Sequence, residues 1–581
     1  MVVNPFSSGT SRVNPAGETV DTGIPRSVAA NMTTAEQFEW HQNNLKRHSV
    51  SRRNFLAGSA AAAAAAGVGN LAFSGIAYAA DAPLAVGGRH VSFGSDAASQ
   101  LRFSAQLSRN PGATKVFLDH GPTPALGATT VAEVRNLVSQ VPISSGGILG
   151  AEQFYVHAPV DGLPSRVPHF YRWRTADGRT TDVRSAAPAL GRGRSAPFRF
   201  TMMGDQGVDE TPTQPPGLKA GDYDDLYYKA DNQPNVKHAA NIVNQIAARN
   251  GAFHILAGDI AYADPSGAGK PPNFVPSGSA PSGFDKFNPY VWDGYFAAIE
   301  KTASRTPWMF ATGNHDMEAL YGPQGYGGHA ARLDQPTNGP AGCPSVYSVV
   351  YGNVAVLSLD ANDVSYEITA NTGYSGGRQT GWVASTLAKF RADPNIDFIV
   401  AFFHHCAYST TDSHASDGGV RAAWSKLFDQ YQVDAVFQAH NHIFERTDPI
   451  RNNQARKPAP DGSTVSAKTD GTVYYTVGGG GRPRYGFQPG ESESYRGNVV
   501  KDNTVPNSYV WTADGKKQAE SVEWSRVRFR NYSFISIDVV PGIPGITKSR
   551  MDISAIDEYG REFDRLTFTR AISIGGVPFG S

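Results

Sequence analysis

The sequence contains little cysteine: its 581 residues include only Cys343 and Cys406. Two cysteines can form neither a scaffold of several disulfides nor a cysteine-rich zinc module. Two interpretations of the pair stay open. If the protein is exported, the two thiols could form a disulfide. Alternatively, Cys406 lies two residues after His404, a candidate metal ligand, and could place a thiol near bound metal ions.

An excess of charge of one sign is also lacking. The 52 Lys and Arg residues balance the 52 Asp and Glu residues, and no basic stripe alternates with aromatic residues. Surfaces that bind nucleic acid usually carry such a basic excess, so we expect no nucleic-acid binding. The apolar content of 40% is typical of a globular protein. The length is too great for one hydrophobic core and predicts two or three domains.

Long hydrophobic runs are absent after residue 80, so we expect no transmembrane segment. Residues 1–48 are polar, show no period and are predicted to be a disordered leader. Arg52 and Arg53 then precede an Ala/Gly-rich stretch, a pattern typical of a twin-arginine export signal over residues 49–80. An alanine-rich helix or a membrane anchor is the alternative. We expect export by the twin-arginine route to an extracellular, periplasmic or cell-wall-associated location.

The pattern of the chain changes twice after the signal. Residues 83–190 consist of short alternating runs separated by turn residues, for example Leu101 to Ala105 and His169 to Trp173. This pattern predicts a small β-sandwich of the fibronectin III or immunoglobulin type, in which the histidines are structural or surface residues. Residues 197–570 alternate buried strands with helical patterns and predict an α/β domain. Residues 448–470 are polar and are predicted to be a surface insertion.

Five apolar strands in the second region each end in a residue type that binds metals. The residues that follow these strands are Asp205, Asp259 with Tyr262, Asn314 with His315, His404, and His440 with His442. A single Asp after a strand is usually part of an ordinary glycine turn, but the recurrence argues against that explanation. Open α/β sheets bind ligands at the carboxyl ends of their strands, so we expect these side chains to converge.

The donor types indicate the kind of site. Two carboxylates, a phenol, an amide and three or four imidazoles suffice for two metal ions that share a bridging carboxylate, and they are too rich in oxygen for a structural zinc site. Two ions about 3.5 Å apart can clamp a phosphoryl group and generate a nucleophile from water. His440 and His442 would share a face of an extended backbone, so each could reach a different ion.

The order of the motifs resembles the metallophosphoesterases: GDQG at 204–207, GDIAY at 258–262, GNHD at 313–316, FFHH at 402–405 and AHNH at 439–442. Tyr262 and the preceding sandwich make the chain similar to the purple acid phosphatases from about residue 90 onward. The resemblance implies an α/β fold with a two-sheet α/β/β/α catalytic domain after the sandwich. It also implies an exported acid phosphatase that hydrolyses small phosphate monoesters by metal-activated water.

The resemblance further implies a role for each site residue. Asp205, Asp259, Tyr262 and His442 would hold Fe(III). Asp259 would bridge to a divalent ion (Fe, Zn or Mn) that is also held by Asn314, His404 and His440. His315 and His414 would bind the substrate phosphate and assist the leaving group. The Tyr262 phenolate would give the protein a visible colour, and the ferric ion predicts an acidic pH optimum.

Three departures from the family pattern are visible. His405 follows His404, yet His404 is the predicted ligand because it keeps the family spacing to Tyr408. Ala439 stands where the family has glycine and would be strained at a positive φ. Asp316 stands where glutamate is common, and we expect little effect.

Alternative functions also stay open. One is a phosphodiesterase or nucleotide-cleaving enzyme on the same metal core, decided by the loops 208–233, 264–290, 321–345 and 410–418. Another is a non-catalytic protein whose sandwich binds a partner. The sandwich could also contribute contacts to a homodimer.

Overall fold

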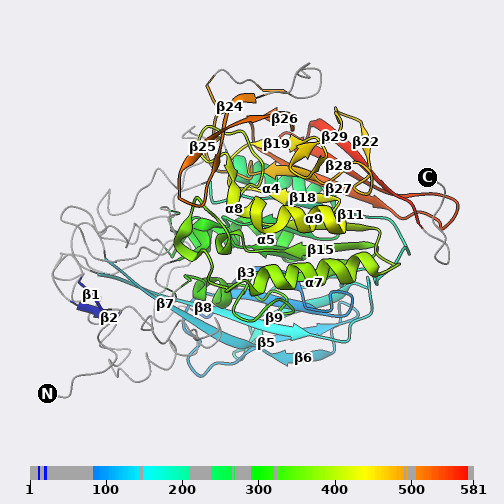
Figure 1. Cartoon of the computed structure of the whole chain (residues 1–581). Helices are drawn as coiled ribbons and strands as arrows, with labels where there is room; N and C mark the ends of the chain where they lie inside the picture. Colours follow the sequence, from blue (N-terminus) through cyan, green and yellow to red (C-terminus); the bar gives the residue numbers. More distant parts are fainter. Residues whose placement is uncertain are drawn as a thin grey trace.

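A computed structural model describes residues 83–142, 148–209, 237–264, 267, 289–318, 321, 324–489, 493–494 and 505–572 (Figure 1). It also describes two short antiparallel strands, β1 (Ser11–Val13) and β2 (Thr19–Asp21). The rest of the predicted leader and the whole predicted signal lie outside the described residues. No helix in the described part of the chain has the length and apolar character needed to span a membrane.

The first region contains two four-stranded antiparallel sheets, drawn in blue and cyan in Figure 1. One has the order β3-β4-β8-β7, with β3 (Val86–Phe93), β4 (Leu101–Leu107), β8 (Ile148–Val160) and β7 (Glu133–Pro142). The other has the order β10-β9-β5-β6, with β10 (Arg184–Ala186), β9 (His169–Thr175), β5 (Val116–Gly121) and β6 (Ala128–Val131). The rings of Phe103 and Tyr171, one from each sheet, lie 4.4 Å apart, so the sheets pack against each other.

Two seven-stranded mixed sheets form the core of the second region. The Asp205 sheet has the order β13 (Trp308–Ala311), β12 (His254–Ala257), β11 (Phe198–Met203), β27 (Ser533–Val540), β28 (Ser549–Asp557), β29 (Glu562–Arg570) and β22 (Thr464–Val465). The His404 sheet has the order β14 (Tyr347–Tyr351), β15 (Val354–Ser358), β16 (Phe398–Phe402), β18 (Ala435–Gln438), β23 (Val473–Val477), β19 (Phe444–Thr447) and β26 (Ser525–Phe529). The strands that precede the candidate site residues run parallel within each sheet.

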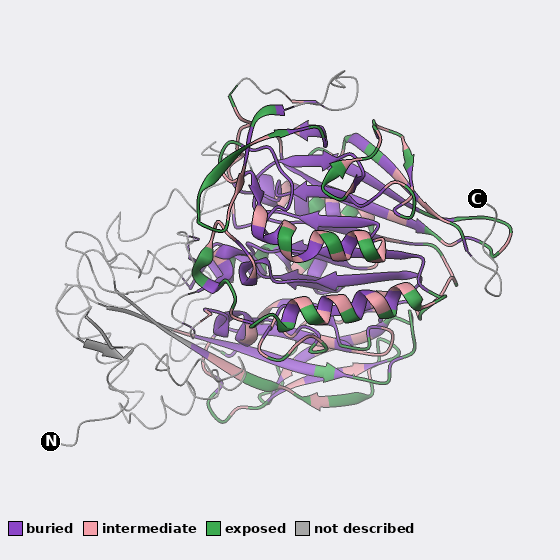
Figure 2. Ribbon diagram, viewed as in Figure 1, coloured by how far each residue is buried: buried purple, intermediate pink, exposed green. Residues whose placement is uncertain are grey.

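Successive side chains of each strand point to opposite faces of the sheet and pack into different layers. On β16, Val400 and Phe402 pack in the core between the sheets, whereas Ile399 and Ala401 pack against helices. Helices α4 (His238–Arg249) and α5 (Val291–Ala303) cover the outer face of the Asp205 sheet, and α7 (Arg378–Ala392) and α9 (Lys426–Tyr431) cover that of the His404 sheet. Figure 2 shows the sheets buried between helices whose outward sides are exposed. The predicted two-sheet arrangement and its helices are therefore present.

Several elements differ from the sequence-based expectations. The predicted loop 321–345 contains α6 (Gly327–Arg332). The helical segment before β18 consists of α8 (Gly418–Val420), joined to α9 by a π-helical turn, η5 (Arg421–Ser425). The surface insertion predicted at 448–470 is wrong in part. It carries β20 (Ile450–Arg451) and β21 (Gln454–Ala455), and its strand β22 joins the Asp205 sheet by pairing with β29.

The two regions meet at α5 and α6. His90 stacks on Phe296 with ring centroids 4.6 Å apart, and Arg89 pairs with Glu300. His157 Nε2 donates to the Ala331 carbonyl at 2.9 Å. These histidines are buried, so of the two roles expected for them they have the structural one.

Candidate metal centre and active site

Tight turns at the strand ends aim the candidate ligands. Asp205, Asp259, Tyr262 and His440 all have positive φ values, 55°, 50°, 61° and 67°. Such values are uncommon for residues other than glycine and cluster at functional sites. Ala439 is not among the positive-φ residues, so alanine at this position carries no backbone strain.

One group of ligand atoms is centred on Tyr262. Its Oη donates to Asp205 Oδ1 at 3.0 Å and lies 3.0 Å from His442 Nε2. The remaining distance of this triangle, between His442 Nε2 and Asp205 Oδ1, is 3.4 Å. All three residues are buried. A carboxylate, a phenol and an imidazole therefore face one point between the two sheets.

A second group is centred on His404. Its Nε2 lies 3.0 Å from Asn314 Oδ1, 3.1 Å from Asp259 Oδ2 and 3.2 Å from His440 Nδ1. The same nitrogen is 4.0 Å from Asp205 Oδ1, which links the second group to the first. The structure thus brings together all seven residues that the sequence analysis selects as ligands. Four come from the Asp205 sheet and three from the His404 sheet.

Hydrogen bonds at the far side of each ring orient the imidazoles. The pairs are His404 Nδ1 with Ala257 O at 2.9 Å, His442 Nδ1 with Pro483 O at 2.8 Å, and His440 Nε2 with Glu367 Oε2 at 3.1 Å. In each pair the ring nitrogen donates, because the partner can only accept. The lone pair of the other nitrogen then points into the cluster, as metal-binding histidines require.

The electrostatics of the cluster fit cations. Burial opposes ionisation of Asp259, but His404 and His315 hold its pKa well below the usual range. Burial and the charges of Asp205 and Asp259 raise the pKa of Tyr262 well above its usual value, so a phenolate there needs a strong positive charge. Burial opposes protonation of His404, but Asp259 raises its pKa to about 9, so a proton occupies the position that a cation would take. The donor set therefore fits two metal ions.

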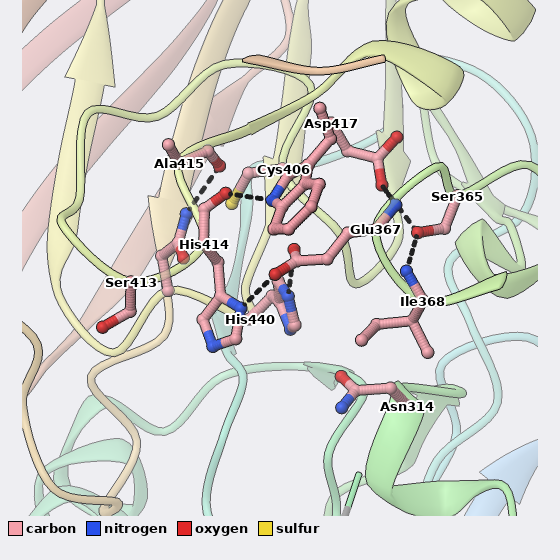
Figure 3. Close-up of polar contacts among 12 residues, drawn as sticks. Asn314, Ser365, Glu367, Ile368, Cys406, Ser413, His414, Ala415, Asp417 and His440 are labelled. Atoms are coloured by element: carbon pink, nitrogen blue, oxygen red, sulfur yellow. Dashed lines mark hydrogen bonds and ion pairs between the residues drawn. The ribbon is translucent and has the colours of Figure 1, made fainter. Parts of the chain in front are cut away.

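The two predicted catalytic histidines flank this cluster where it reaches solvent. His315 Nε2 is 3.9 Å from Asp259 Oδ2, and the His315 ring packs on Tyr262 at 4.3 Å. The His414 ring lies 4.2 Å from that of His440 (Figure 3). The His315 and His414 side chains are 14% and 26% exposed, whereas the ligand side chains are buried. Both can therefore contact a molecule bound over the cluster.

His405 and the cysteines stay outside the ligand cluster. Neither nitrogen of buried His405 has a hydrogen-bond partner among the described residues, and its ring lies 4.5 Å from that of His440. Cys343 and Cys406 are both free and buried, so the disulfide interpretation is wrong. Cys406 Sγ donates to the Ala439 carbonyl at 2.8 Å. Burial raises its pKa well above the usual value, which keeps the thiol protonated and unsuited to bind a metal.

Three residues at the site are missed by the sequence analysis. Glu367 accepts hydrogen bonds from His414 and His440. The Arg482 guanidinium lies 4.6 Å from the centre of the Tyr262 ring, and Tyr485 stacks on His442 at 4.1 Å. Arg482 and Tyr485 follow β23 and its run of glycines, so the rule that strand ends carry the site could have found them. No comparable signal marks Glu367.

Comparisons with known proteins agree with this geometry. The model of the family described as calcineurin-like phosphoesterase matches residues 225–444, which include every candidate ligand except Asp205. An uncharacterized protein of Mycobacterium tuberculosis is 31% identical over 541 residues, 86% of this chain and 91% of that protein. Probable inactive purple acid phosphatase 27 of Arabidopsis thaliana is 30% identical over 213 residues, 33% of each chain. The solved structure of purple acid phosphatase PPD1 from yellow lupin seeds has a TM-score of 0.59 at 17% identity, covering 86% of this chain and 78% of that one.

Proposed function

We propose that this chain, which contains a calcineurin-like phosphoesterase domain and has purple acid phosphatases among its homologues, is an exported acid phosphatase. Its substrates would be small phosphate monoesters. The observation that carries the proposal is the triangle formed by Tyr262, Asp205 and His442. A phenol next to a carboxylate is a hard, anionic donor set when ionised, which favours a ferric ion over a softer one.

The proposed metal pair uses the seven residues of the cluster. Asp205, Tyr262 and His442 would hold Fe(III), and Asn314, His404 and His440 would hold a divalent ion, Fe, Zn or Mn. Asp259 would bridge the two ions. When bound, such a pair neutralises charge on phosphoryl oxygens and makes water a better nucleophile at low pH.

The histidines at the exposed side would serve the substrate. His315 Nδ1 donates to the Asp264 carbonyl at 2.7 Å, which leaves Nε2 free to contact a phosphate oxygen. His414 Nδ1 donates to Glu367, which leaves its Nε2 free in the same way. A histidine in either place can donate a proton to the departing alkoxide. Both residues would therefore bind phosphate, and one of them would protonate the leaving group.

Family membership alone does not make the chain an enzyme, because one relative is named a probable inactive phosphatase. The chain supports catalysis by keeping a full set of seven ligand residues in two groups that are linked by His404 and Asp205. A phosphodiesterase on the same core is the alternative. Comparing the hydrolysis of a monoester and a diester of one alcohol separates the two, and a faster diester would replace the monoesterase proposal.

Location and partners form part of the same proposal. Residues 49–80 would direct the folded protein through the twin-arginine route, and residues 83–190 would form a fibronectin III-like sandwich that could contribute contacts to a homodimer. The zero net charge supports small substrates over nucleic acid.

The visible absorption spectrum tests the proposal. The purified protein should show a broad visible band that Tyr262→Phe removes, because only a tyrosinate bound to Fe(III) supplies the transition. Tyr485→Phe is the matched control: this phenol also contacts His442 but belongs to neither ligand group, so the band should survive. A colourless, metal-loaded and active wild-type protein would contradict a ferric tyrosinate site. An activity optimum well above neutral pH would do the same.

A further inference from the structure

Glu367 connects the metal-ligand cluster to a substrate histidine. Its Oε1 accepts from His414 Nδ1 at 2.6 Å, and its Oε2 accepts from His440 Nε2 at 3.1 Å (Figure 3). The Glu367 side chain is only 8% exposed. An ionised carboxylate is the one side-chain group that offers two acceptor oxygens and no donor. Each oxygen is used for one imidazole.

Contacts that involve neither ligand nor substrate hold Glu367 in place. The Asp417 carboxylate accepts from the backbone N–H groups of Tyr366 at 3.0 Å and of Glu367 at 3.2 Å. It also accepts from Ser365 Oγ at 2.6 Å. The backbone N–H of Asp417 donates to the Cys406 carbonyl at 2.7 Å, two residues after His404. The backbone of Glu367 is therefore tied, through Asp417, to the segment that follows His404.

The His414 loop is fixed from its other side. Trp511 Nε1, on β24 (Val505–Trp511), donates to the His414 carbonyl at 2.9 Å. Asn441 Nδ2 donates to the Ala415 carbonyl at 3.0 Å, which ties the loop to the turn between His440 and His442. Neither backbone contact determines how the His414 ring is turned. Among the described residues, that ring forms one hydrogen bond, the bond to Glu367.

We propose that Glu367 is a positioning residue that orients His440 for the divalent ion and His414 for the substrate phosphate at the same time. The inference rests on the proposed function and deepens it. On His440, the bond at Nε2 keeps the Nδ1 lone pair directed at His404 and Asp259. On His414, the bond at Nδ1 fixes the ring and leaves Nε2 free to contact a substrate phosphate. One carboxylate thereby sets both the affinity for the ion and the contact with the substrate.

Glutamine cannot replace Glu367 in this arrangement. Its amide offers one acceptor oxygen and one N–H₂ donor group, whereas both imidazole nitrogens that face residue 367 carry hydrogens. Glu367→Gln must therefore break one of the two bonds or force one ring into the other tautomer. Outer-sphere partners of metal-binding histidines typically contribute about 10–100-fold in metal affinity or activity.

The first test measures metal affinity without turnover. The divalent ion is titrated out of the protein with a graded chelator, and the visible band reports the other ion. Glu367→Gln should release the divalent ion about 10–100-fold more readily and keep the band. Glu133→Gln, the same change at an exposed ion pair with Arg135, should match the wild type. Unchanged affinity for the divalent ion in a folded Glu367→Gln protein would overturn the proposal.

The second test separates the two histidines. KM is measured for an ester that the wild type hydrolyses. Glu367→Gln should raise KM when His414 is present. In a His414→Ala protein, adding Glu367→Gln should not change KM further. The loss of metal affinity should be the same in both backgrounds. An equal rise in KM without His414 would refute the link to the substrate. A wild-type protein that binds no second ion would refute the proposed function itself, which distinguishes the two failures.

Discussion

Acid should destabilise the protein through His254, and the size of the effect follows from its surroundings. The side chain lies on β12 with no solvent exposure. Its Nδ1 contacts Thr201 Oγ1 at 2.8 Å, and its Nε2 has no hydrogen-bond partner among the described residues. Burial lowers the pKa of His254 from 6.5 to about 3. The folded protein therefore keeps this ring neutral at pH values where the unfolded chain protonates it.

The direction of the pH effect on stability depends on how many protons the folded and unfolded states bind. Between pH 6.5 and about 3 the unfolded chain binds one more proton at this residue, so the free energy of unfolding falls as the pH falls. The loss is about 1.4 kcal/mol per pH unit. At pH 4.5, two units below 6.5, His254 alone should cost about 3 kcal/mol relative to neutral pH.

The assay compares denaturant unfolding at pH 7.5 and 4.5 for the wild type and His254→Asn. Asparagine leaves a small cavity, but that cost is the same at both pH values and cancels in the difference. The variant should therefore lose about 3 kcal/mol less than the wild type between the two pH values. Trp308→Phe is the control, because it loosens the contact with the His254 ring, 4.3 Å away, without removing a titrating group. A His254→Asn protein with the wild-type pH dependence would refute the reasoning.

Three further predictions follow from buried features. Gly258 has a φ of 84°, and a Cβ added there would lie 2.6 Å from the backbone nitrogen of Gly313. Gly258→Ala should therefore strain the turn that carries Asp259 and reduce the metal content of the protein. Gly381→Ala, on α7 with no atom within 4 Å of the added Cβ, should leave the metal content unchanged. Asp564→Ala leaves the wholly buried Arg446 without its carboxylate and should lower the free energy of unfolding by about 3–5 kcal/mol, seen as a lower urea midpoint. Burial raises the pKa of Cys343 to about 12, so a thiol reagent should modify no cysteine in the native protein and two after denaturation. If the reagent modified no cysteine after denaturation, Cys343 and Cys406 would have to form a disulfide.

The candidate ligands could be predicted from the sequence because each follows a buried strand directly. The strand is recognisable as an apolar run, and the ligand lies within a few residues of its end. Asp205, Asp259 and His404 are of this kind. Their convergence depends only on parallel strands that end at the same edge of a sheet, which is a general property of such folds.

Residues placed by tertiary contacts could not be found in this way. Glu367 lies between two short 3-10 helices, η3 (Ala361–Asp363) and η4 (Thr369–Asn371), and reaches the site because Asp417, fifty residues later, binds its backbone. The strand β22 was missed for a related reason. It has two residues, and the pairing of Val465 with Phe568 depends on a strand that comes a hundred residues later.

The order of strands in the Asp205 sheet has a consequence for protein synthesis. β11, which ends at Asp205, is flanked by β12 and by β27, where Phe200 lies opposite Ile537. A nascent chain on the ribosome can form β11 and β12 early, but one edge of β11 stays unpaired until β27, in the last tenth of the polypeptide, has been translated. Open strand edges recruit other chains, so the protein depends on protection from aggregation during this interval. Messages truncated before residue 533 should therefore yield insoluble product, not a partly active fragment.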